Sequence, residues 1–252
     1  MDTLETLYAV NRYDDEYLTN YLHRENATVE YSFFNTGVLF TPLKLVYAPF
    51  DECRIESRDF VFGEQVGYGT KYSLGYFQMN LGTSEFMEMM ETKLPDSEET
   101  WNSTVQQYRT GTEKSYSLEE LMQYRQHMKE TYLKEIVLTE KLEEYVGEIT
   151  KDCETPLQKM KAIEKELSRF TYTNMPGKLP KDIDSPEEYL EYFLLESREG
   201  YCAYFATTFV LLARAEGLPA RYVEGFYVPI TEDKVMEVYS NEAHAWPEVY
   251  FE

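Results

Sequence analysis

The sequence is short of several residue types, and each shortage excludes a class of protein or site. It has three cysteines, three histidines and two tryptophans in 252 residues. Three cysteines are too few for the disulfide framework of a small secreted domain, and no Cys-x-x-Cys pair or Cys/His cluster predicts a zinc site. Cys53 and Cys153 could pair and leave Cys202 free, or all three could be free thiols. The sequence alone leaves both arrangements open.

Basic residues are also scarce, with 24 lysines and arginines against 46 aspartates and glutamates and a net charge of −22. This balance repels phosphate backbones and anionic lipid, so we expect no nucleic-acid partner and no direct contact with a membrane surface. The opening "MDTLETLYAV" lacks the basic and apolar regions of a signal peptide. The longest apolar run, near "CAYFATTFVLLARA", is too short to span a bilayer. We therefore expect a soluble chain that reaches a membrane only through segments outside it.

Glycines are scattered, with no phosphate-binding loop, and the acids form no calcium-binding pattern, so no metal or organic cofactor is predicted. Tyrosine, in contrast, is abundant, with 23 residues. Tyrosines on half-buried strands and helices, with their hydroxyls at the surface, are the plainer interpretation. A surface that binds carbohydrate or peptide is the alternative.

The chain divides by pattern into two parts. Residues 1–110 read as a β-rich module with short helices, because strand-like runs such as "CRIESRDFVF" and "KYSLGYFQM" alternate with turn residues. Residues 111–252 begin with charged helical segments and continue into a core of helices and strands. Two helix starts are marked by capping residues, Thr155 before Pro156 and Ser185 three residues before Glu188. We expect the second helix to run to about Glu196 and the segment "FTYTNMPGKLPKDID" before it to be a loop.

The last third of the chain predicts an α+β domain. The run Cys202 to Glu216 is apolar on nearly every side, which indicates a central buried helix, and Gly217 follows as its stop signal. Three strand-like runs come next: "ARYVEGFYV", "KVMEVYS" and "AHAWPEVYF". We expect these strands to form an antiparallel sheet that packs on the buried helix.

Cys202 is the candidate nucleophile because it stands at the start of this helix. A free thiol has a pKa of about 8.5 and is mostly protonated at neutral pH. A helix N-terminus favours the thiolate, and its unpaired N–H groups suit the oxyanion that forms when a thiolate attacks a carbonyl. The plain alternative is a small buried residue with a structural role.

A reactive thiol also needs a base, and the sequence offers few histidines. His23 and His127 lie in or beside charged helical patterns, and we interpret both as ordinary exposed residues. His244 lies in "NEAHAWPEVYF", on a predicted strand able to pack against the start of the cysteine helix. We therefore pair Cys202 with His244 as candidate catalytic residues, with a structural histidine as the alternative.

The run "GYCAYFATTFVLLARAEGLPARYVEGF" followed by "AHAWPEVYF" closely resembles the core of the transglutaminase-like superfamily. The shared pattern is a glycine-aromatic-Cys opening, an apolar helix, a Gly-Leu-Pro-Ala-Arg turn and His-Ala-Trp on a strand. The resemblance covers about Thr155 to Glu252 and is nearest to bacterial, membrane-anchored members. It implies a papain-like fold and a Cys-His-Asp triad, with Cys202 as nucleophile and His244 as base.

The acid of that triad normally lies on the next strand, and this sequence stops at Glu252 before such a strand. Glu248 is about 13 Å along a strand from His244, and Glu242 is about 6.6 Å away and points parallel to the histidine, so neither is a good substitute. We expect the acid to lie beyond this chain, the chain to be a fragment of a longer protein, and its own activity to be low.

The resemblance implies a thiol enzyme that transfers acyl groups from protein or peptide amides, with the fate of the thioester open between water and an amine. The alternative is a non-catalytic scaffold that binds peptides. The expected location is the extracytoplasmic side of a bacterial membrane, where substrates include proteins near the cell wall. The module of residues 1–110 is expected to be a spacer or to bind partners through its tyrosines, and the sequence predicts no oligomeric state.

Overall fold

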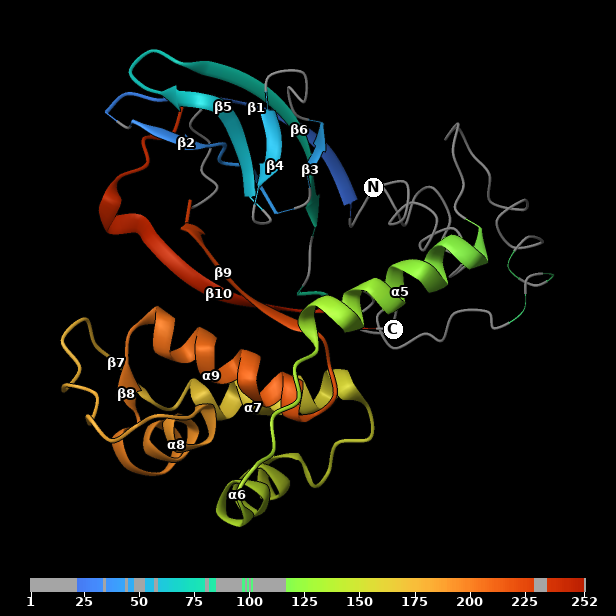
Figure 1. Cartoon of the computed structure of the whole chain (residues 1–252), viewed down its shortest axis with the longest axis vertical. Coiled ribbons are helices and arrows are strands. Elements are labelled where there is room, and N and C mark those ends of the chain that lie inside the picture. Colours follow the sequence, from blue (N-terminus) through green and yellow to red (C-terminus); the bar gives the residue numbers. More distant parts are fainter. Residues whose placement is uncertain are drawn as a thin grey trace. The chain divides into compact units, whose positions relative to one another are not determined.

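The computed structural model describes residues 22–33, 35–43, 45–47, 53–56, 59–79, 82–84, 97, 99, 101, 117–228 and 235–251 (Figure 1). The chain forms two compact units, Met1–Leu121 and Met122–Glu252. Helix α5 (Leu118–Tyr132) begins just before the boundary between them. The predicted boundary lay at residue 110, within a part of the chain that the structure does not describe.

The first unit contains two three-stranded antiparallel sheets. One sheet has the order β1 (Leu22–Glu30), β6 (Lys71–Met79) and β3 (Leu45–Tyr47). The other has the order β2 (Thr36–Val38), β5 (Asp59–Val66) and β4 (Cys53–Glu56). The strand-like runs of the sequence therefore form strands, and "CRIESRDFVF" forms the β4–β5 hairpin.

Buried tyrosines hold the core of this unit together. Tyr31 and Tyr72 are about 95% buried and pack edge to face, with their ring centroids 5.8 Å apart. Each hydroxyl donates to a backbone carbonyl, Tyr31 to Val38 at 2.6 Å and Tyr72 to Phe40 at 2.7 Å. These two tyrosines are structural, as the plainer interpretation expects, but they are buried rather than half-buried, and their hydroxyls bond to backbone carbonyls rather than reach the surface.

The second unit contains most of the helices that the structure describes. After α5 come α6 (Glu140–Thr150), α7 (Pro156–Leu167), the short strand β7 (Thr171–Tyr172) and α8 (Pro186–Glu191). A single π-helical turn, Tyr192–Ser197, leads to strand β8 (Glu199–Gly200) and the long helix α9 (Cys202–Ala215). Strand β9 (Ala220–Phe226), a 3-10 turn (Ser240–Glu242) and strand β10 (Ala243–Val249) complete it.

Local sequence signals set the ends of these helices. Thr155 caps α7 by accepting a hydrogen bond from the Gln158 N–H. Ser185 and Glu188 form the predicted capping box at α8, where each side chain accepts from the other residue's backbone N–H. Gly217 follows the C-cap of α9 and has φ at +80°, a conformation that glycine adopts without strain.

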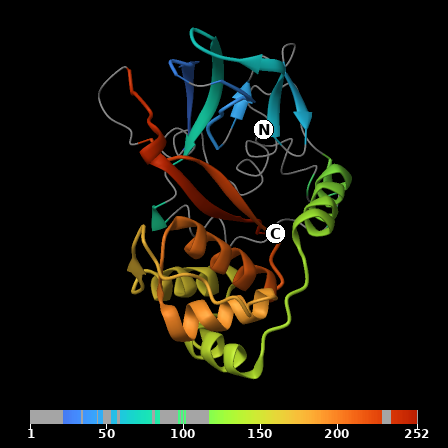
Figure 2. The ribbon, with the colours of Figure 1, turned by 60° about the vertical axis from the view of Figure 1, so that its left-hand side comes forward.

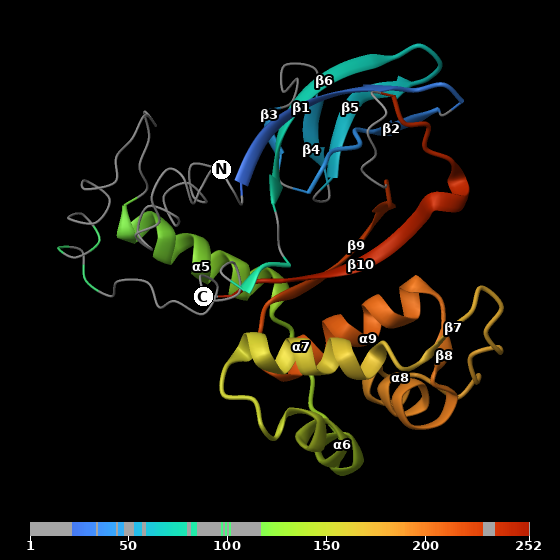
Figure 3. The ribbon, with the colours of Figure 1, turned by 180° about the vertical axis from the view of Figure 1, so that it is seen from behind.

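Helix α9 is the centre of the unit. All three views show it between the antiparallel pair β9–β10 and helices α6 to α8 (Figures 1, 2 and 3). Its inner face joins a cluster of buried side chains from α6, α7, α8 and the π-helical turn. The largest fully buried members of that cluster are Leu142, Ile163, Leu190, Phe193, Leu194 and Leu212. The predicted α+β arrangement, a buried helix covered by antiparallel strands, is therefore confirmed.

The structure corrects three details of the sequence interpretation. "KVMEVYS" was expected to be a strand, but Val235–Tyr239 forms no regular structure and ends in the 3-10 turn. The helix expected to run to Glu196 is α-helical only to Glu191 and then widens into the π-helical turn. The segment expected to be a loop after Phe170 contains strand β7.

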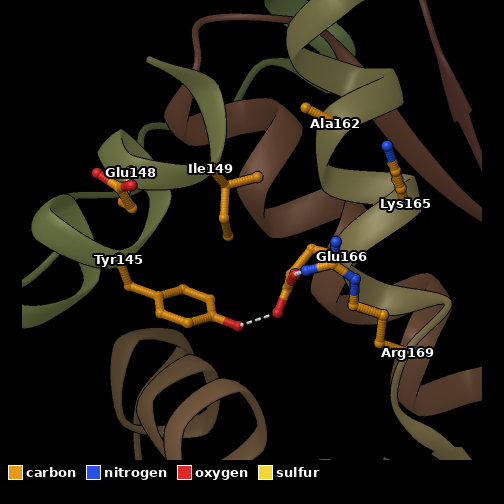
Figure 4. Close-up of a pocket in the computed structure, with 7 residues that line it drawn as sticks. All are labelled: Tyr145, Glu148, Ile149, Ala162, Lys165, Glu166 and Arg169. Carbon is orange, nitrogen blue, oxygen red and sulfur yellow. Dashed lines mark hydrogen bonds and ion pairs between the residues drawn. The ribbon is translucent and has the colours of Figure 1, made fainter. Parts of the chain in front are cut away.

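A buried carboxylate ties α6 and α7 to the segment that leads into α9. Glu166, with 12% of its side chain exposed, accepts from the Tyr145 hydroxyl at 2.8 Å and pairs with Arg169 at 2.6 Å (Figure 4). It also pairs with Arg198 at 2.8 Å, and that guanidinium lies 4.3 Å from the centre of the Phe170 ring. Because Arg198 has φ at +49°, these contacts hold a strained residue four positions before Cys202.

The same contacts determine the protonation state of Glu166. Burial alone would raise the pKa of Glu166, but the Tyr145 hydrogen bond and the two arginines outweigh burial and lower that pKa. Burial and the Glu166 hydrogen bond raise the pKa of Tyr145 to about 12. Glu166 is therefore a carboxylate and Tyr145 a neutral donor across the physiological pH range. These residues line a pocket of about 450 Å³, in which Glu148, Glu166 and Arg169 each have a charged partner.

We predict that Glu166→Gln lowers the free energy of unfolding by about 1–3 kcal/mol at pH 7, because two arginines lose their carboxylate. A folded pKa below the unfolded value of about 4.3 means that Glu166 stabilises the fold above that pH. The stabilisation disappears as pH falls through the folded pKa, so the difference between wild type and variant should shrink between about pH 5 and pH 3. Urea unfolding at several pH values measures it, and a difference independent of pH would contradict the assignment.

Candidate active site

The start of α9 is held by a short pair of parallel strands. β7 pairs with β8 so that the Thr171 N–H donates to the Arg198 carbonyl at 2.9 Å and the Thr173 N–H donates to the Gly200 carbonyl at 2.8 Å. Tyr201 then takes an extended conformation as the residue before the helix, and Cys202 is the first helical residue. The backbone of the candidate nucleophile is thus fixed on its N-terminal side by hydrogen bonds.

Gly200 is needed here because the chain passes very close to the first turn of α9. A Cβ atom on Gly200 would lie 2.7 Å from Cβ and Cγ of Tyr204. Tyr204 is itself fixed by its ring contacts, an edge-to-face contact with Tyr201 at 5.0 Å and a tilted contact with Phe193 at 5.9 Å. Glycine at this position therefore allows the bend that presents Cys202.

Cys202 is a free thiol and is partly exposed. Its backbone N–H donates to the hydroxyl oxygen of Tyr172, on β7, at 3.3 Å. The Tyr172 ring stacks on Phe205 with centroids 6.0 Å apart. Burial raises the pKa of Tyr172, and the neighbouring Cys202 thiol adds to that rise while the Cys202 N–H opposes it. A neutral tyrosine hydroxyl therefore lies beside both the amide and the thiol of the candidate nucleophile.

His244 lies on β10, at the same end of the unit as the start of α9. The chain reverses after α9, so β9 runs back along the helix and β10 returns antiparallel to β9. The register pairs His244 with Gly225, near the end of β9. A Cβ atom on Gly225 would meet the Trp246 ring at 2.8 Å, so the tryptophan covers this glycine on the His244 face of the ribbon.

Among the described residues, no hydrogen bond joins the Cys202 thiol to the His244 ring, and no carboxylate contacts that ring. Alternation along β10 places His244 on the opposite face from Val249, which packs into the core around α9. Glu248 pairs instead with Arg221 at 2.5 Å, and Glu242 accepts from the Tyr239 N–H at 2.5 Å. His244 therefore lies at the same end of the unit as Cys202, but its side chain is on the face of the β9–β10 pair opposite the one that packs on α9.

The other histidines and cysteines lie outside this site or have side chains that the structure does not describe. His127 is exposed on α5, and His23 lies on β1, where side chains near the start of the strand are outside the description. Cys153 is a free thiol, and the side chain of Cys53 lies outside the described residues. The described part of the chain holds no group of three or more metal-ligating side chains and no helix long and apolar enough to cross a membrane.

Sequence reasoning missed two tyrosines that surround the thiol. Tyr172 falls in a segment interpreted as a loop, although the alternation in "FTYT" is a short strand signal. Tyr222, on β9, has its pKa raised to about 12 by burial, by its hydrogen bond to Glu224 and by the charges of Cys202 and Tyr201. The chain has 23 tyrosines, and no sequence pattern distinguishes Tyr172 and Tyr222 from the others as neighbours of the thiol.

The second unit defines a class of protein. It is an α+β core of the papain-like kind, with a free cysteine on the first turn of its central helix. Comparison with known proteins agrees. The family model described as transglutaminase-like superfamily matches residues 143–252. The match supports the resemblance to the transglutaminase-like superfamily that the sequence motifs predicted.

Two individual proteins are similar to this chain. The uncharacterized protein YebA of Bacillus subtilis is 34% identical over 122 residues, which are 45% of this chain and 16% of that protein. The crystal structure of the periplasmic domain of TgpA from Pseudomonas aeruginosa superposes with a TM-score of 0.54 and 15% identity, covering 90% of this chain and 65% of that one. The chain spans less than two thirds of either relative, and the second likeness supports the fold.

We predict that Gly200→Ala destabilises the protein by about 1–3 kcal/mol, because the added methyl group overlaps a Tyr204 side chain that cannot move freely. Gly177→Ala is the matched control, since nothing lies within 4 Å of a Cβ at that exposed glycine. The control should be neutral or slightly stabilising. Denaturant unfolding of both variants measures the effect, and equal stabilities would show that Tyr204 does not constrain the turn.

Proposed function

We propose that this protein is a thiol enzyme that transfers acyl groups from protein or peptide amides. The observation that carries the proposal is Cys202, a free, partly exposed thiol on the first turn of a buried helix, with its amide already in a hydrogen bond. The N-terminal end of a helix stabilises an anion, and the surrounding fold holds the sulfur in one place. The match to the transglutaminase-like superfamily supports the same chemistry.

In this proposal His244 takes the proton of the Cys202 thiol, directly or through one water molecule. The thiolate attacks the amide carbonyl carbon, the carbon–nitrogen bond breaks, and the proton passes from the imidazole to the leaving amine. The thioester on Cys202 is then resolved by water or by an amine, which regenerates the thiol. Because the His244 ring does not contact the thiol in the described structure, this step requires the imidazole to move toward Cys202 when substrate binds.

The acid that orients the imidazole is proposed to come from the strand that follows His-Ala-Trp in transglutaminase-like proteins. Glu242 and Glu248 are unsuited to that role, since each has another partner. A location on the extracytoplasmic side of a bacterial membrane, with proteins near the cell wall as substrates, is supported by the likeness to a periplasmic domain.

We predict that iodoacetamide modifies Cys202 at pH 6 at least about tenfold faster than it modifies free cysteine, because a helix N-terminus and an imidazole together favour the thiolate. His244→Ala should reduce the rate to that of free cysteine. The measurement is mass spectrometry of the peptide that contains Cys202 over a time course.

His127→Ala is the control, because that histidine is exposed on α5. It should leave the rate unchanged. A wild-type rate equal to that of free cysteine would support the alternative function, a peptide-binding scaffold in which Cys202 has no chemical role.

A further inference from the structure

The surface beside Cys202 carries a carboxylate and two aromatic rings. Tyr222 and Glu224 are two residues apart on β9 and therefore share a face of the ribbon. That face is turned toward α9, because Ala220, on the same face, is 1% exposed within the core around α9. The Tyr222 hydroxyl donates to Glu224 Oε1 at 2.8 Å, which fixes the carboxylate beside the ring.

Tyr201 supplies the second ring from the other side of the thiol. It directly precedes Cys202 and is 38% exposed, and Tyr222 is 37% exposed. Cys202 and Tyr201 both contribute to the raised pKa of Tyr222, in agreement with a β9 face that is turned toward α9. Two partly exposed tyrosines, and the carboxylate that one of them holds, therefore lie on the side of the unit that carries the start of α9.

The charge of Glu224 has no cationic partner among the described residues, although other acids of the same unit do. Glu166 pairs with two arginines and Glu248 with one. Glu224 is exposed and accepts only the neutral Tyr222 hydroxyl in the described structure. A carboxylate and aromatic faces are the groups that proteins use to bind an ammonium or a guanidinium.

We propose that Tyr201, Tyr222 and Glu224 form a binding subsite for a cationic side chain of the substrate, a lysine or arginine close to the amide that Cys202 attacks. The inference rests on the proposed function, since it assigns the substrate class of the same site. The carboxylate neutralises the cation, and the rings bind its apolar stem and face. A thiolate at Cys202 adds a further negative charge, so the occupied subsite favours the ionised nucleophile as well.

The experiment compares two methanethiosulfonate reagents of similar size, one carrying a trimethylammonium group and the other a sulfonate. Both form a mixed disulfide with the thiolate and release sulfinate, and the measured quantity is the ratio of their rate constants at Cys202, followed by peptide mass spectrometry. We expect the cationic reagent to react at least about tenfold faster in the wild type. Glu224→Gln and Tyr222→Leu should each reduce the ratio at least about threefold.

Glu144→Gln is the matched control, because it removes the same charge from an exposed position on α6. It should leave the ratio unchanged. An equal ratio in Glu224→Gln and Glu144→Gln would overturn the subsite, and so would a ratio that Tyr222→Leu leaves intact, since long-range charge alone would then explain the preference. The rate with neutral iodoacetamide tests the proposed function separately, so failure of one proposal is distinguishable from failure of the other.

Discussion

The pairing of β7 with β8 is the interaction on which the site depends. A helix start leaves several backbone N–H groups without partners, and its position is set only by what precedes it. Here two backbone hydrogen bonds, the Gly200–Tyr204 contact and the ion pairs of Arg198 fix the segment immediately before α9. The inner face of α9 is buried in the core, which opposes a shift of the helix that would compensate for a change at its start. One sulfur is therefore presented at a defined point on the surface of a rigid core.

The fixed start of α9 suits the reactive thiol proposed for Cys202, although the protein is very acidic. A net charge of −22 opposes any further anion, so a thiolate requires local stabilisation. The start of α9 offers the positive end of a helix, and Tyr172 places a neutral hydroxyl beside the sulfur without adding negative charge. The same acidity favours the cationic substrate proposed above. Glu224 fits such a substrate because its carboxylate has no cationic partner among the described residues and accepts only the Tyr222 hydroxyl.

The sequence predicted those parts of the fold that depend on local chemistry. The caps at Thr155 and Ser185 and the stop at Gly217 were correct because each acts within one helical turn. The burial of α9 was correct because an apolar surface on every side has no other stable environment. The two-residue strand β7 was missed because it exists only through its pairing with a segment nearly thirty positions away in the chain.

The candidate site was only partly predictable for the same reason. Cys202 has a local signal, the start of an apolar helix, and His244 was chosen by elimination and by family motif. Tyr172 and Tyr222 approach the thiol through tertiary contacts, which no periodicity encodes. The loss of the expected strand at Val235–Tyr239 shows the converse, since a β-like pattern without a partner strand remained irregular.

The most direct test of the account is an NMR titration of the His244 imidazole in the wild type and in Cys202→Ser. If the thiol and the imidazole share a proton, the two groups titrate together, and removal of the thiol changes the curve. The account predicts that the pH dependence of the His244 ring signals differs between the wild type and the serine variant, because the thiol and the imidazole exchange a proton. Superimposable titration curves would contradict the pairing of Cys202 with His244.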